Sequence, residues 1–379
     1  MMRRARTLEH LRDLLYERPH EAVWRQLIAA LAAEPDPGTQ AIAADYADGT
    51  LEAWPYLLRV APRPWWAARQ RGEQPPAWRL ARALDLSAGA HRDKDAEAFA
   101  RSLAMEELPA LLLRDAGLAG AELRTWLTRV RSAHLTALDL SANPLRRAPD
   151  VAAIAESALD HLDELRLRAC PLEADAFAQL GAPGFMPSLR RLDVSARRMT
   201  RDDLRLLWSG GGPLGLDTLV LEDAGIDELV SEAFAAAPGP ARLRHLHLAD
   251  NALTGGGLWA LAEGPLLPRL ATLDLARNGL FWRDIRALAT LADEGRLERL
   301  VLDGNDIEDA GATFLAGWRA WSGARLVSLR ACRIADPGAL ALADAPWLPG
   351  LEELDLGDNE VGETGKEALK AVLGMKVRF

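Results

Sequence analysis

The sequence is poor in cysteine and contains no long apolar run. Only two cysteines occur in 379 residues, Cys170 and Cys332, which excludes a disulfide framework and favours a reducing compartment. No apolar run approaches the roughly 20 residues that span a bilayer, and the basic N-terminus lacks the apolar stretch of a signal peptide. We therefore expect a cytoplasmic protein without disulfides that does not span a membrane.

The chain also lacks an excess of positive charge. Its 45 Lys and Arg residues against 55 Asp and Glu residues leave a net charge of −10. Because binding to phosphates needs clustered positive charge, we expect no nucleic-acid partner. Lysine occurs at only four positions, so arginine supplies almost all of the basic charge. Together with the abundant alanine, this bias is typical of a GC-rich bacterial genome.

A 27-residue repeat occupies most of the chain. LTALDLSANPL begins at Leu135, LRHLHLADNAL at Leu243 and LATLDLARNGL at Leu270, and the same register has eleven starts between Ala81 and Leu351. Each copy follows L-x-x-L-x-L-x-x-N/C-x-L, in which the fourth and sixth positions lie on the inward face of a short strand. Apolar residues then recur at helical spacing, as in WRDIRALATLA. Each repeat is therefore predicted to contain one strand and one helix.

The ninth position of each repeat is expected to turn the chain. An Asn or Cys there can bond to backbone groups that the turn leaves unpaired. Ala116, Arg197 and Ala224 depart from this rule, so the ladder should be weaker or rerouted in those repeats. The predicted turn ladder consists of Asn143, Cys170, Asn251, Asn278, Asn305, Cys332 and Asn359.

These repeats resemble bacterial leucine-rich-repeat proteins of the ribonuclease-inhibitor-like class, over about residues 81–377. The resemblance implies an α/β leucine-rich-repeat solenoid, a horseshoe of eleven 27-residue repeats. A parallel β-sheet would form the concave face and helices the convex face. LIAALAAEPDPGTQAIAADYAD further resembles the bacterial repeat-companion domain, through its E-P-D turn and through Ala44, Asp45 and Tyr46.

Residues 1–80 lack the repeat register and carry five of the twelve tryptophans. Helical spacing of apolar residues predicts helices near residues 8–15 and 23–31, with a weaker one in TQAIAADYAD. We expect APRPWWAARQRGEQPPAW to form an irregular connection. We interpret residues 1–80 as an α-helical capping domain, with an independent binding domain as the alternative, and residues 81–379 as the solenoid. A short C-terminal strand, with Val377 and Phe379, should close the core.

A catalytic site needs a nucleophile, a base and an orienting group that converge. Both cysteines fall on the ninth position, which explains them structurally, and the chain has no glycine-rich phosphate motif. His245, His247 and Asp274 could hold a metal ion on adjacent strands, but no fourth ligand is evident. We therefore predict no enzymatic activity, no cofactor and no metal.

Function is expected on the exposed strand positions of the concave face, roughly in repeats three to eight. The third, fifth, seventh and eighth positions are acidic but mixed in charge, which suits a polar or basic protein surface. We predict a protein-interaction module, with an enzyme regulator such as a GTPase-activating or inhibitor protein as the alternative. Filling of the groove by the chain's own N-terminus would count against it. The candidate contact residues are Arg166, Arg168, Arg191, Asp193, Glu222, His245, His247, Asp274, Arg299 and Asp303.

Overall fold

Short strands recur through the chain at the third to fifth positions of the repeats. The first eleven are each offset by 27 residues, as the register predicts, and a two-residue strand follows them. The strands are β1 (Ala83–Asp85), β2 (Ala110–Leu112), β3 (Ala137–Asp139), β4 (Glu164–Arg166), β5 (Arg191–Asp193), β6 (Thr218–Val220), β7 (His245–His247), β8 (Thr272–Asp274), β9 (Arg299–Val301), β10 (Leu326–Ser328), β11 (Glu353–Asp355) and β12 (Val377–Arg378).

The computed structural model divides the chain into two compact units. One comprises Met1–Leu145 with Ala152–Arg166, and the other Arg146–Val151 with Leu167–Phe379. This division falls within the repeats, so the split into a cap of residues 1–80 and a solenoid of residues 81–379 stays a proposal based on the repeat register. The residues described are 2–17, 19–75, 77–130, 134–157, 159–182, 184–208, 215–236, 239–289, 296–318, 321 and 323–379.

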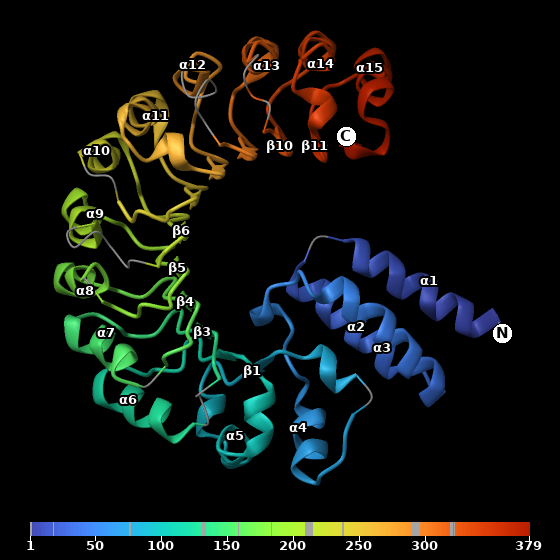
Figure 1. Cartoon of the computed structure of the whole chain (residues 1–379), viewed down its shortest axis with the longest axis vertical. Helices are drawn as coiled ribbons and strands as arrows, with labels where there is room; N and C mark the ends of the chain where they lie inside the picture. The colour runs from blue at the N-terminus through green and yellow to red at the C-terminus, as the bar shows by residue number, and fades with distance from the viewer. Residues whose placement is uncertain are drawn as a thin grey trace. The chain divides into compact units, whose positions relative to one another are not determined.

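The first unit begins with three helices that pack side by side (Figure 1). Asp36 caps α3 by accepting a hydrogen bond from Thr39 N at 2.8 Å, and Pro37 occupies its first position, where a missing N–H has no cost. The helices of this unit are α1 (Met2–Tyr16), α2 (Glu21–Ala32), α3 (Pro37–Leu51), η1 (Tyr56–Leu58), α4 (Arg63–Gln70), η2 (Trp78–Leu80), η3 (Ala90–Arg92), α5 (Lys94–Ala100), η4 (Leu103–Glu107) and α6 (Gly120–Arg129); α7 (Ala148–Ala155) follows β3.

The segment after α3 corrects one expectation. Its part RPWWAARQ is not irregular: it forms α4, with Pro64 in its first turn and Trp66 buried. Proline favours the first turn of a helix, so the same residue that suggests a loop can begin a helix. Just before α4, Val60 pairs in parallel with Ala83 of β1, and Ala61 N donates to Ala83 O at 2.8 Å. The N-terminal segment thereby extends the parallel pairing of β1 to β4 by one bridge.

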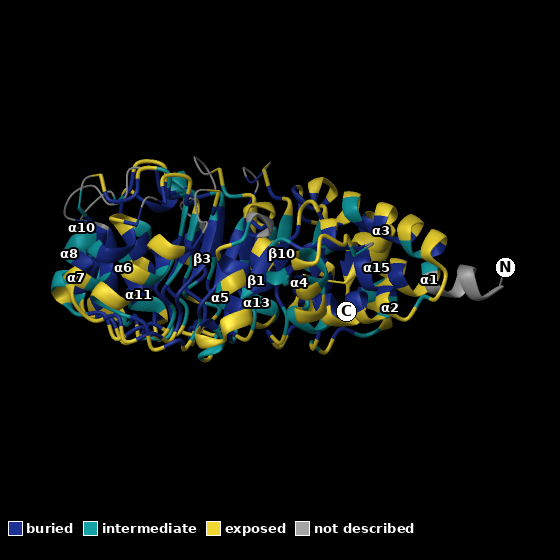
Figure 2. Ribbon diagram, turned by 90° about the horizontal axis from the view of Figure 1, so that it is seen from below, coloured by how far each residue is buried: buried dark blue, intermediate teal, exposed yellow. Residues whose placement is uncertain are grey.

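In the second unit the parallel strands β5 to β12 lie along the inner side and the helices along the outer side (Figure 1). Figure 2 shows helices that carry both buried and exposed residues. The fourth-position residues of its strands, from Leu192 to Leu354, are fully buried. The helices are α8 (Ala174–Leu180), α9 (Arg201–Trp208), α10 (Glu228–Ala236), α11 (Thr254–Glu263), η5 (Leu267–Arg269), α12 (Arg286–Ala289), α13 (Glu308–Ala316), α14 (Asp336–Ala343), η6 (Leu348–Gly350), α15 (Glu363–Leu373) and η7 (Gly374–Lys376).

Neighbouring helices approach closely where one side chain caps the next helix. Asp309 Oδ1 of α13 accepts hydrogen bonds from Ala335 N and Gly338 N, at 2.8 and 2.9 Å. A Cβ at Gly338 would lie 2.6 Å from that oxygen. Asp336 serves Gly362 and Gly365 in the same way one repeat later. The repeats are therefore joined through helix N-termini as well as through strands.

The eighth position of all eleven repeats adopts the left-handed backbone conformation. The φ angles there lie between 48° and 68°, although only one of the residues is glycine. Aspartate tolerates this conformation better than most side chains, but alanine and arginine are strained in it. The residues are Ala88, Asp115, Ala142, Ala169, Ala196, Asp223, Asp250, Arg277, Gly304, Ala331 and Asp358.

The C-terminus ends in the predicted strand. Val377 of β12 is buried and pairs with Leu354 of β11. Phe379 does not cover the core: it is 37% exposed, and its ring lies under the ammonium groups of Lys366 and Lys370. The two basic groups hold this ring at the surface.

Parallel strands, with helical segments after each of the first eleven, confirm the predicted α/β leucine-rich-repeat solenoid of eleven repeats. Among the described residues, none of the helices is long and apolar enough to cross a bilayer.

Candidate functional site

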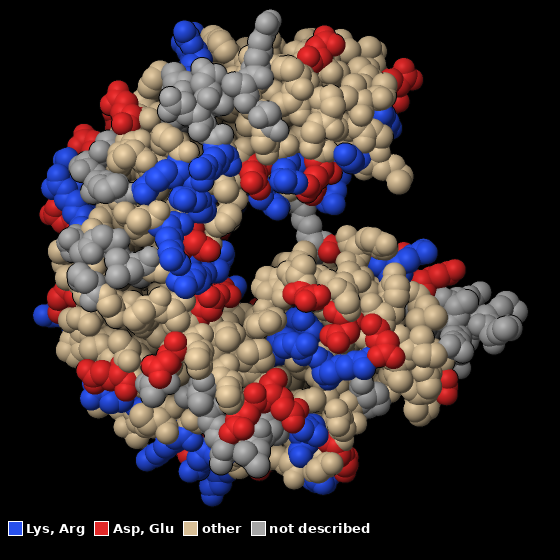
Figure 3. Space-filling view, in the orientation of Figure 1, with Lys and Arg blue, Asp and Glu red and all other residues tan. Residues whose placement is uncertain are grey.

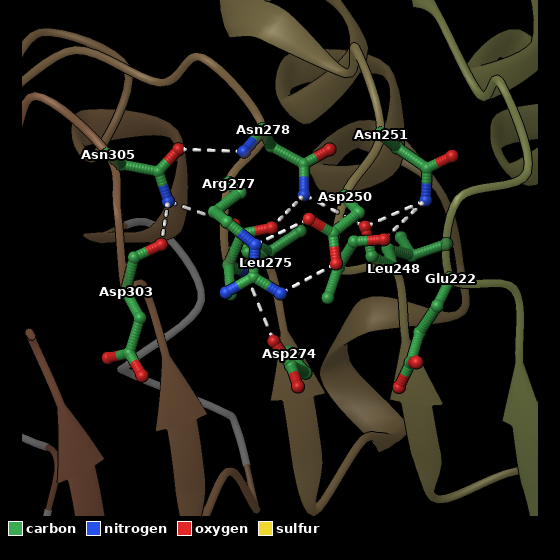
Figure 4. Close-up of polar contacts among 12 residues, drawn as sticks. Glu222, Leu248, Asp250, Asn251, Asp274, Leu275, Arg277, Asn278, Asp303 and Asn305 are labelled. Atoms are coloured by element: carbon green, nitrogen blue, oxygen red, sulfur yellow. Dashed lines mark hydrogen bonds and ion pairs between the residues drawn. The ribbon is translucent and has the colours of Figure 1, made fainter.

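The asparagines at the ninth position bridge consecutive repeats. Asn305 Nδ2 donates to Leu275 O of the preceding repeat at 2.9 Å and to Leu302 O of its own repeat at 2.8 Å. Its Oδ1 accepts from Asn278 N and Leu280 N, at 2.9 and 3.0 Å. Figure 4 shows Asn251, Asn278 and Asn305 on successive turns. Asn143, Asn251 and Asn359 make the same bonds. Asn278 makes two of the four, with Leu253 N and Leu248 O.

Where alanine occupies the ninth position, its backbone N–H still has a hydrogen-bond acceptor. Asn143 Oδ1 accepts from Ala116 N, and Asn251 Oδ1 accepts from Ala224 N, each from the following repeat. At the third departure, the Arg197 guanidinium lies 4.6 Å from the Phe177 ring centre and 3.7 Å from Asp203. Burial lowers the pKa of Arg197. Arg197 Nη1 is buried without a hydrogen-bond partner, so this side chain packs against the preceding repeat and does not take over the hydrogen bonds of the asparagine.

Both cysteines are buried thiols that form no disulfide. Cys332 Sγ donates to Leu302 O and Arg330 O at 3.3 Å, so it imitates the asparagine amide. Burial raises the pKa of Cys332 to about 12. A thiol held protonated in this way is a poor nucleophile, which agrees with a structural role.

Aspartates at the fifth position end the strands, a role that the strand pattern does not reveal. Asp193 Oδ1 accepts a hydrogen bond from Ser195 N at 2.9 Å, and Asp274 Oδ1 accepts one from Ala276 N at 3.0 Å. Asp139 and Asp355 do the same from buried positions. Part of the acidity of this face therefore stabilises the turns after the strands.

In the first unit, the strand face of repeats one to three is apolar at the third position of each repeat and at Leu112, and these residues are covered. Ala83, Ala110, Leu112 and Ala137 pack against Leu57 of η1 in one buried cluster. Arg166, at the fifth position of repeat four, instead pairs with Glu164 of the same strand at 2.7 Å. The chain's own N-terminal segment thus occupies the first part of the concave face, including repeat three.

In the second unit the strand face is polar. Arg168 lies 3.6 Å from Glu222, and both side chains are over a third exposed. Burial raises the pKa of Glu222, and the neighbouring Asp193 and Asp274 add to this shift. Asp303 Oδ1 accepts from Arg330 N at 2.9 Å, and burial raises the pKa of Asp303. The carboxylates along this face are therefore close enough to disfavour one another's charge.

The two histidines of β7 do not converge with Asp274 on one point. His245 Nδ1 hydrogen-bonds Thr272 Oγ1 at 2.8 Å, whereas His247 Nδ1 lies 3.8 Å from Asp274 Oδ2. Burial lowers the pKa of His245, so this imidazole favours the neutral state. Across the described residues, no group of three or more His, Cys, Asp or Glu side chains is arranged to hold a metal ion.

The remaining candidates and further arginines make the face mixed in charge. Arg191 is half-buried and Arg299 exposed at the third position of their strands. Arg277 pairs with Asp250, and Arg330 lies 2.5 Å from Asp358, pairs that the sequence pattern alone does not single out. Figure 3 shows basic and acidic side chains next to one another along this inner side. The arrangement offers salt bridges and hydrogen bonds to a partner rather than a converging set of reactive groups.

Known proteins share these repeats. A family model described as Leucine Rich repeat matches residues 242–262, 297–316 and 350–370. The ribonuclease inhibitor of Sus scrofa is 31% identical over 221 residues, which cover 55% of this chain and 48% of that protein. The ribonuclease inhibitor of Mus musculus is 32% identical over 195 residues, 48% of this chain and 42% of that protein. The chain therefore spans just under half the length of these relatives.

A solved structure extends the comparison to nearly the whole chain. The crystal structure of the Rad7 and Elc1 complex in yeast contains a chain with a TM-score of 0.52 at 16% identity, covering 88% of this chain and 79% of that one. This similarity is one of fold. The family model and the sequence relatives support a leucine-rich-repeat protein similar to ribonuclease inhibitor.

Proposed function

We propose that this chain is a non-enzymatic, cytoplasmic protein-interaction module, and that the polar strand face of its second unit binds another protein. One observation carries the proposal: Arg168, Glu222 and Arg299 are exposed or half-exposed on this face, and Arg168 and Glu222 are only loosely paired with each other. Charged groups held on a rigid sheet but incompletely neutralised suit recognition of a partner with complementary charge.

The proposed binding region excludes repeat three, although the sequence led us to expect contacts roughly in repeats three to eight. Because Leu57 covers the strand face of repeats one to three, recognition is proposed for the later repeats. Asp193 and Asp274 would contribute mainly by ending strands, while Arg168, Arg191, Glu222, His247 and Arg299 would make the contacts. In the same proposal, residues 1–80 act as a cap.

Affinity purification from the native cell, followed by quantitative mass spectrometry, tests this proposal. Proteins captured by the wild-type chain should be lost with the double variant Glu222→Arg, Arg299→Glu, which reverses two charges of the face. The control is Glu367→Arg, on the exposed side of α15, which should keep them. Equal capture by all three proteins would refute binding through this face.

The similarity to ribonuclease inhibitors favours a second candidate function, inhibition of a basic enzyme such as a ribonuclease. Its support is the 31% identity over 221 residues and the net charge of −10. A basic enzyme would be attracted to a chain of this charge at long range, and more strongly at low ionic strength.

An RNA-cleavage assay with a panel of ribonucleases tests the inhibitor. Stoichiometric loss of cleavage, relieved by the double variant and by added salt, would support inhibition. Unchanged RNA cleavage by every ribonuclease, at micromolar concentrations of this protein, would exclude this candidate function. A parallel nucleotide-hydrolysis assay with candidate GTPases addresses the GTPase-activating alternative.

A further inference from the structure

A cavity in the first unit has no part in the strand-face proposal. It has a volume of about 510 Å³ and lies between α2 and the segment that leads into α4. Volumes of a few hundred cubic ångströms are those of small-molecule pockets. Every residue that lines it belongs to the first unit.

One wall of the cavity is a single face of α2. Glu21, Trp24, Arg25, Ile28, Ala29 and Ala32 line it, a spacing of three and four residues that places them in one row. This row extends about 16 Å along the helix axis. The cavity is therefore an elongated trough rather than a round pocket.

The opposite wall is apolar. Leu58, Val60, Pro62, Pro64 and Trp65 supply it. Trp24 is buried and donates its indole N–H to Val60 O at 2.9 Å, which fixes the two walls against each other. Because the trough is held open by this bond and by prolines of restricted backbone, an apolar occupant would meet a preformed site.

The charges lie toward the N-terminal end of α2. Arg114 is neutralised there by Glu21 at 2.9 Å and by Asp85 at 3.5 Å. Arg25 is exposed and donates only a weak bond, 3.4 Å long, to Glu21 O. Among the described residues, no carboxylate lies within ion-pair distance of Arg25. The trough thus combines an apolar length with one guanidinium, that of Arg25, which no described carboxylate pairs directly, beside a Glu21–Arg114–Asp85 cluster that carries one net negative charge.

We propose that this trough binds an amphipathic carboxylate, a medium-length acyl chain whose carboxylate pairs with Arg25. The apolar walls would cover the acyl chain, with Trp24 and Trp65 contacting it. The guanidinium would supply the charge that such a ligand requires. The elongated shape favours a chain over a compact ring system.

Isothermal titration calorimetry of the full chain with decanoate tests this assignment. Decyltrimethylammonium, with a chain of the same length and the opposite charge, is the matched ligand control. We expect saturable binding of one decanoate, about fivefold tighter than the cation, with a negative heat-capacity change from apolar burial. Arg25→Glu should reverse this preference.

A second pair of variants tests the location. Ala29→Glu places a carboxylate in the trough and should weaken binding of decanoate by about tenfold. Gln26→Glu adds the same charge to the same helix outside the trough and should leave affinity within about twofold. Because Ala29, Gln26 and Arg25 are all exposed, the circular dichroism and Tm of the variants should match those of the wild type.

Three results would overturn the proposal. They are the absence of saturable decanoate binding, equal effects of Ala29→Glu and Gln26→Glu, and an unchanged ligand preference in Arg25→Glu. Binding of an apolar dye in the trough without binding of decanoate would assign the trough to another occupant, and it would equally reject the carboxylate.

Discussion

At the scale of single residues, Arg59 connects the end of α3 to η2, the turn that directly precedes the first repeat. Its side chain is 1% exposed, and it donates from Nε to Leu80 O at 2.7 Å and from Nη1 to Leu51 O at 2.9 Å. Leu51 is the last residue of α3, where carbonyl groups lack partners within the helix. Burial lowers the pKa of Arg59 to about 10, so the group stays charged at neutral pH. Asp48, 3.6 Å away, compensates this charge.

Replacement of Arg59 by methionine should lower the free energy of unfolding by about 2–4 kcal/mol, because two buried carbonyls lose their donor. Urea unfolding followed by circular dichroism measures this loss. Arg63→Met is the matched control: Arg63 is exposed, lies 3.8 Å from Asp93, and should change stability by less than about 0.5 kcal/mol. Similar losses for the two variants would contradict the role of Arg59.

The carboxyl group of Glu222 makes stability depend on pH. Burial, with Asp193 and Asp274 nearby, raises the pKa of Glu222 in the folded protein. Between the ordinary carboxyl pKa and this raised value, the folded chain binds more protons than the unfolded chain. The stability that this group contributes is therefore complete below the unfolded pKa and is lost as the pH rises through the folded one.

We expect Glu222→Gln to be more stable than the wild type at pH 7.5, because it removes a half-buried negative charge. The advantage should shrink as the pH falls towards 4, where the wild-type carboxyl group is protonated. Urea unfolding at both pH values measures the difference, with Glu367→Gln as an exposed control. A gain as large at pH 4 as at pH 7.5 would show that the carboxyl charge is not its cause.

At the scale of elements, the turns carry much of the specificity of the fold. Each ninth-position asparagine satisfies backbone groups in its own repeat and in the preceding one, so a single side chain fixes the register of two strands. The left-handed residue before it recurs in every repeat and sets the direction of the turn. In repeat nine that residue is Gly304, where a Cβ would lie 2.7 Å from Arg277 Cγ.

Asn305→Ala should cost about 2–4 kcal/mol, because it leaves buried carbonyl and amide groups in two repeats without partners. The adjacent Asp306→Ala removes an ion pair to Arg333 that is largely exposed, and it should cost less than about 0.5 kcal/mol. Chemical denaturation of both variants makes the comparison. A cost for Asn305→Ala no greater than that for Asp306→Ala would refute the ladder.

At the scale of the whole molecule, each repeat contacts chiefly its neighbours, so stability is expected to be local. The first repeats differ from the rest because Leu57 covers their strand face. This cluster joins the N-terminal segment to three repeats at once. The charged strand face of the second unit has no such cover from Leu57.

Leu57→Ala should therefore destabilise the first unit by about 2–4 kcal/mol, through the loss of a fully buried side chain. Hydrogen exchange followed by mass spectrometry should show faster exchange in β1 to β3 and little change in β7 to β10. Tyr56→Ala, at an exposed neighbour in η1, serves as the control. Uniformly faster exchange through all strands would mean that the molecule unfolds as one cooperative unit.

The features that recur in every repeat were predictable, because the same residue type occupies the same position in one copy after another. Leucines at the fourth position of the strands are buried where the pattern places them, and Asn305 bonds as its position requires. Phe379 and the helix at Arg63–Gln70 were not predictable. Each occurs once in the chain. The position of Phe379 depends on Lys366 and Lys370, and the helix begins at prolines that are equally compatible with a loop.

The candidate contact residues were predictable only as positions on a face. Sequence could place Asp193 and Glu222 on the strand face, but the Asx-type bond of Asp193 and the burial of Glu222 arise from neighbouring backbone and charges. Leu57 carries no distinguishing pattern, since one leucine among many cannot indicate which strands it will cover.

By itself, then, the scarcity of cysteine and of basic charge determined little more than the kind of partner to exclude, whereas the 27-residue register determined the fold. Local periodicity suffices for this, because each strand and helix pairs with the next copy of itself. Only the tertiary structure decided that the N-terminal segment covers the first strands, that several acids serve the turns, and that a trough remains beside α2. The covered strands and the trough depend on contacts between residues far apart in the chain, for which the repeat supplies no rule. The acids bond to the backbone two residues further on, but whether such a side chain turns to the backbone or to solvent is decided by its surroundings in the folded chain.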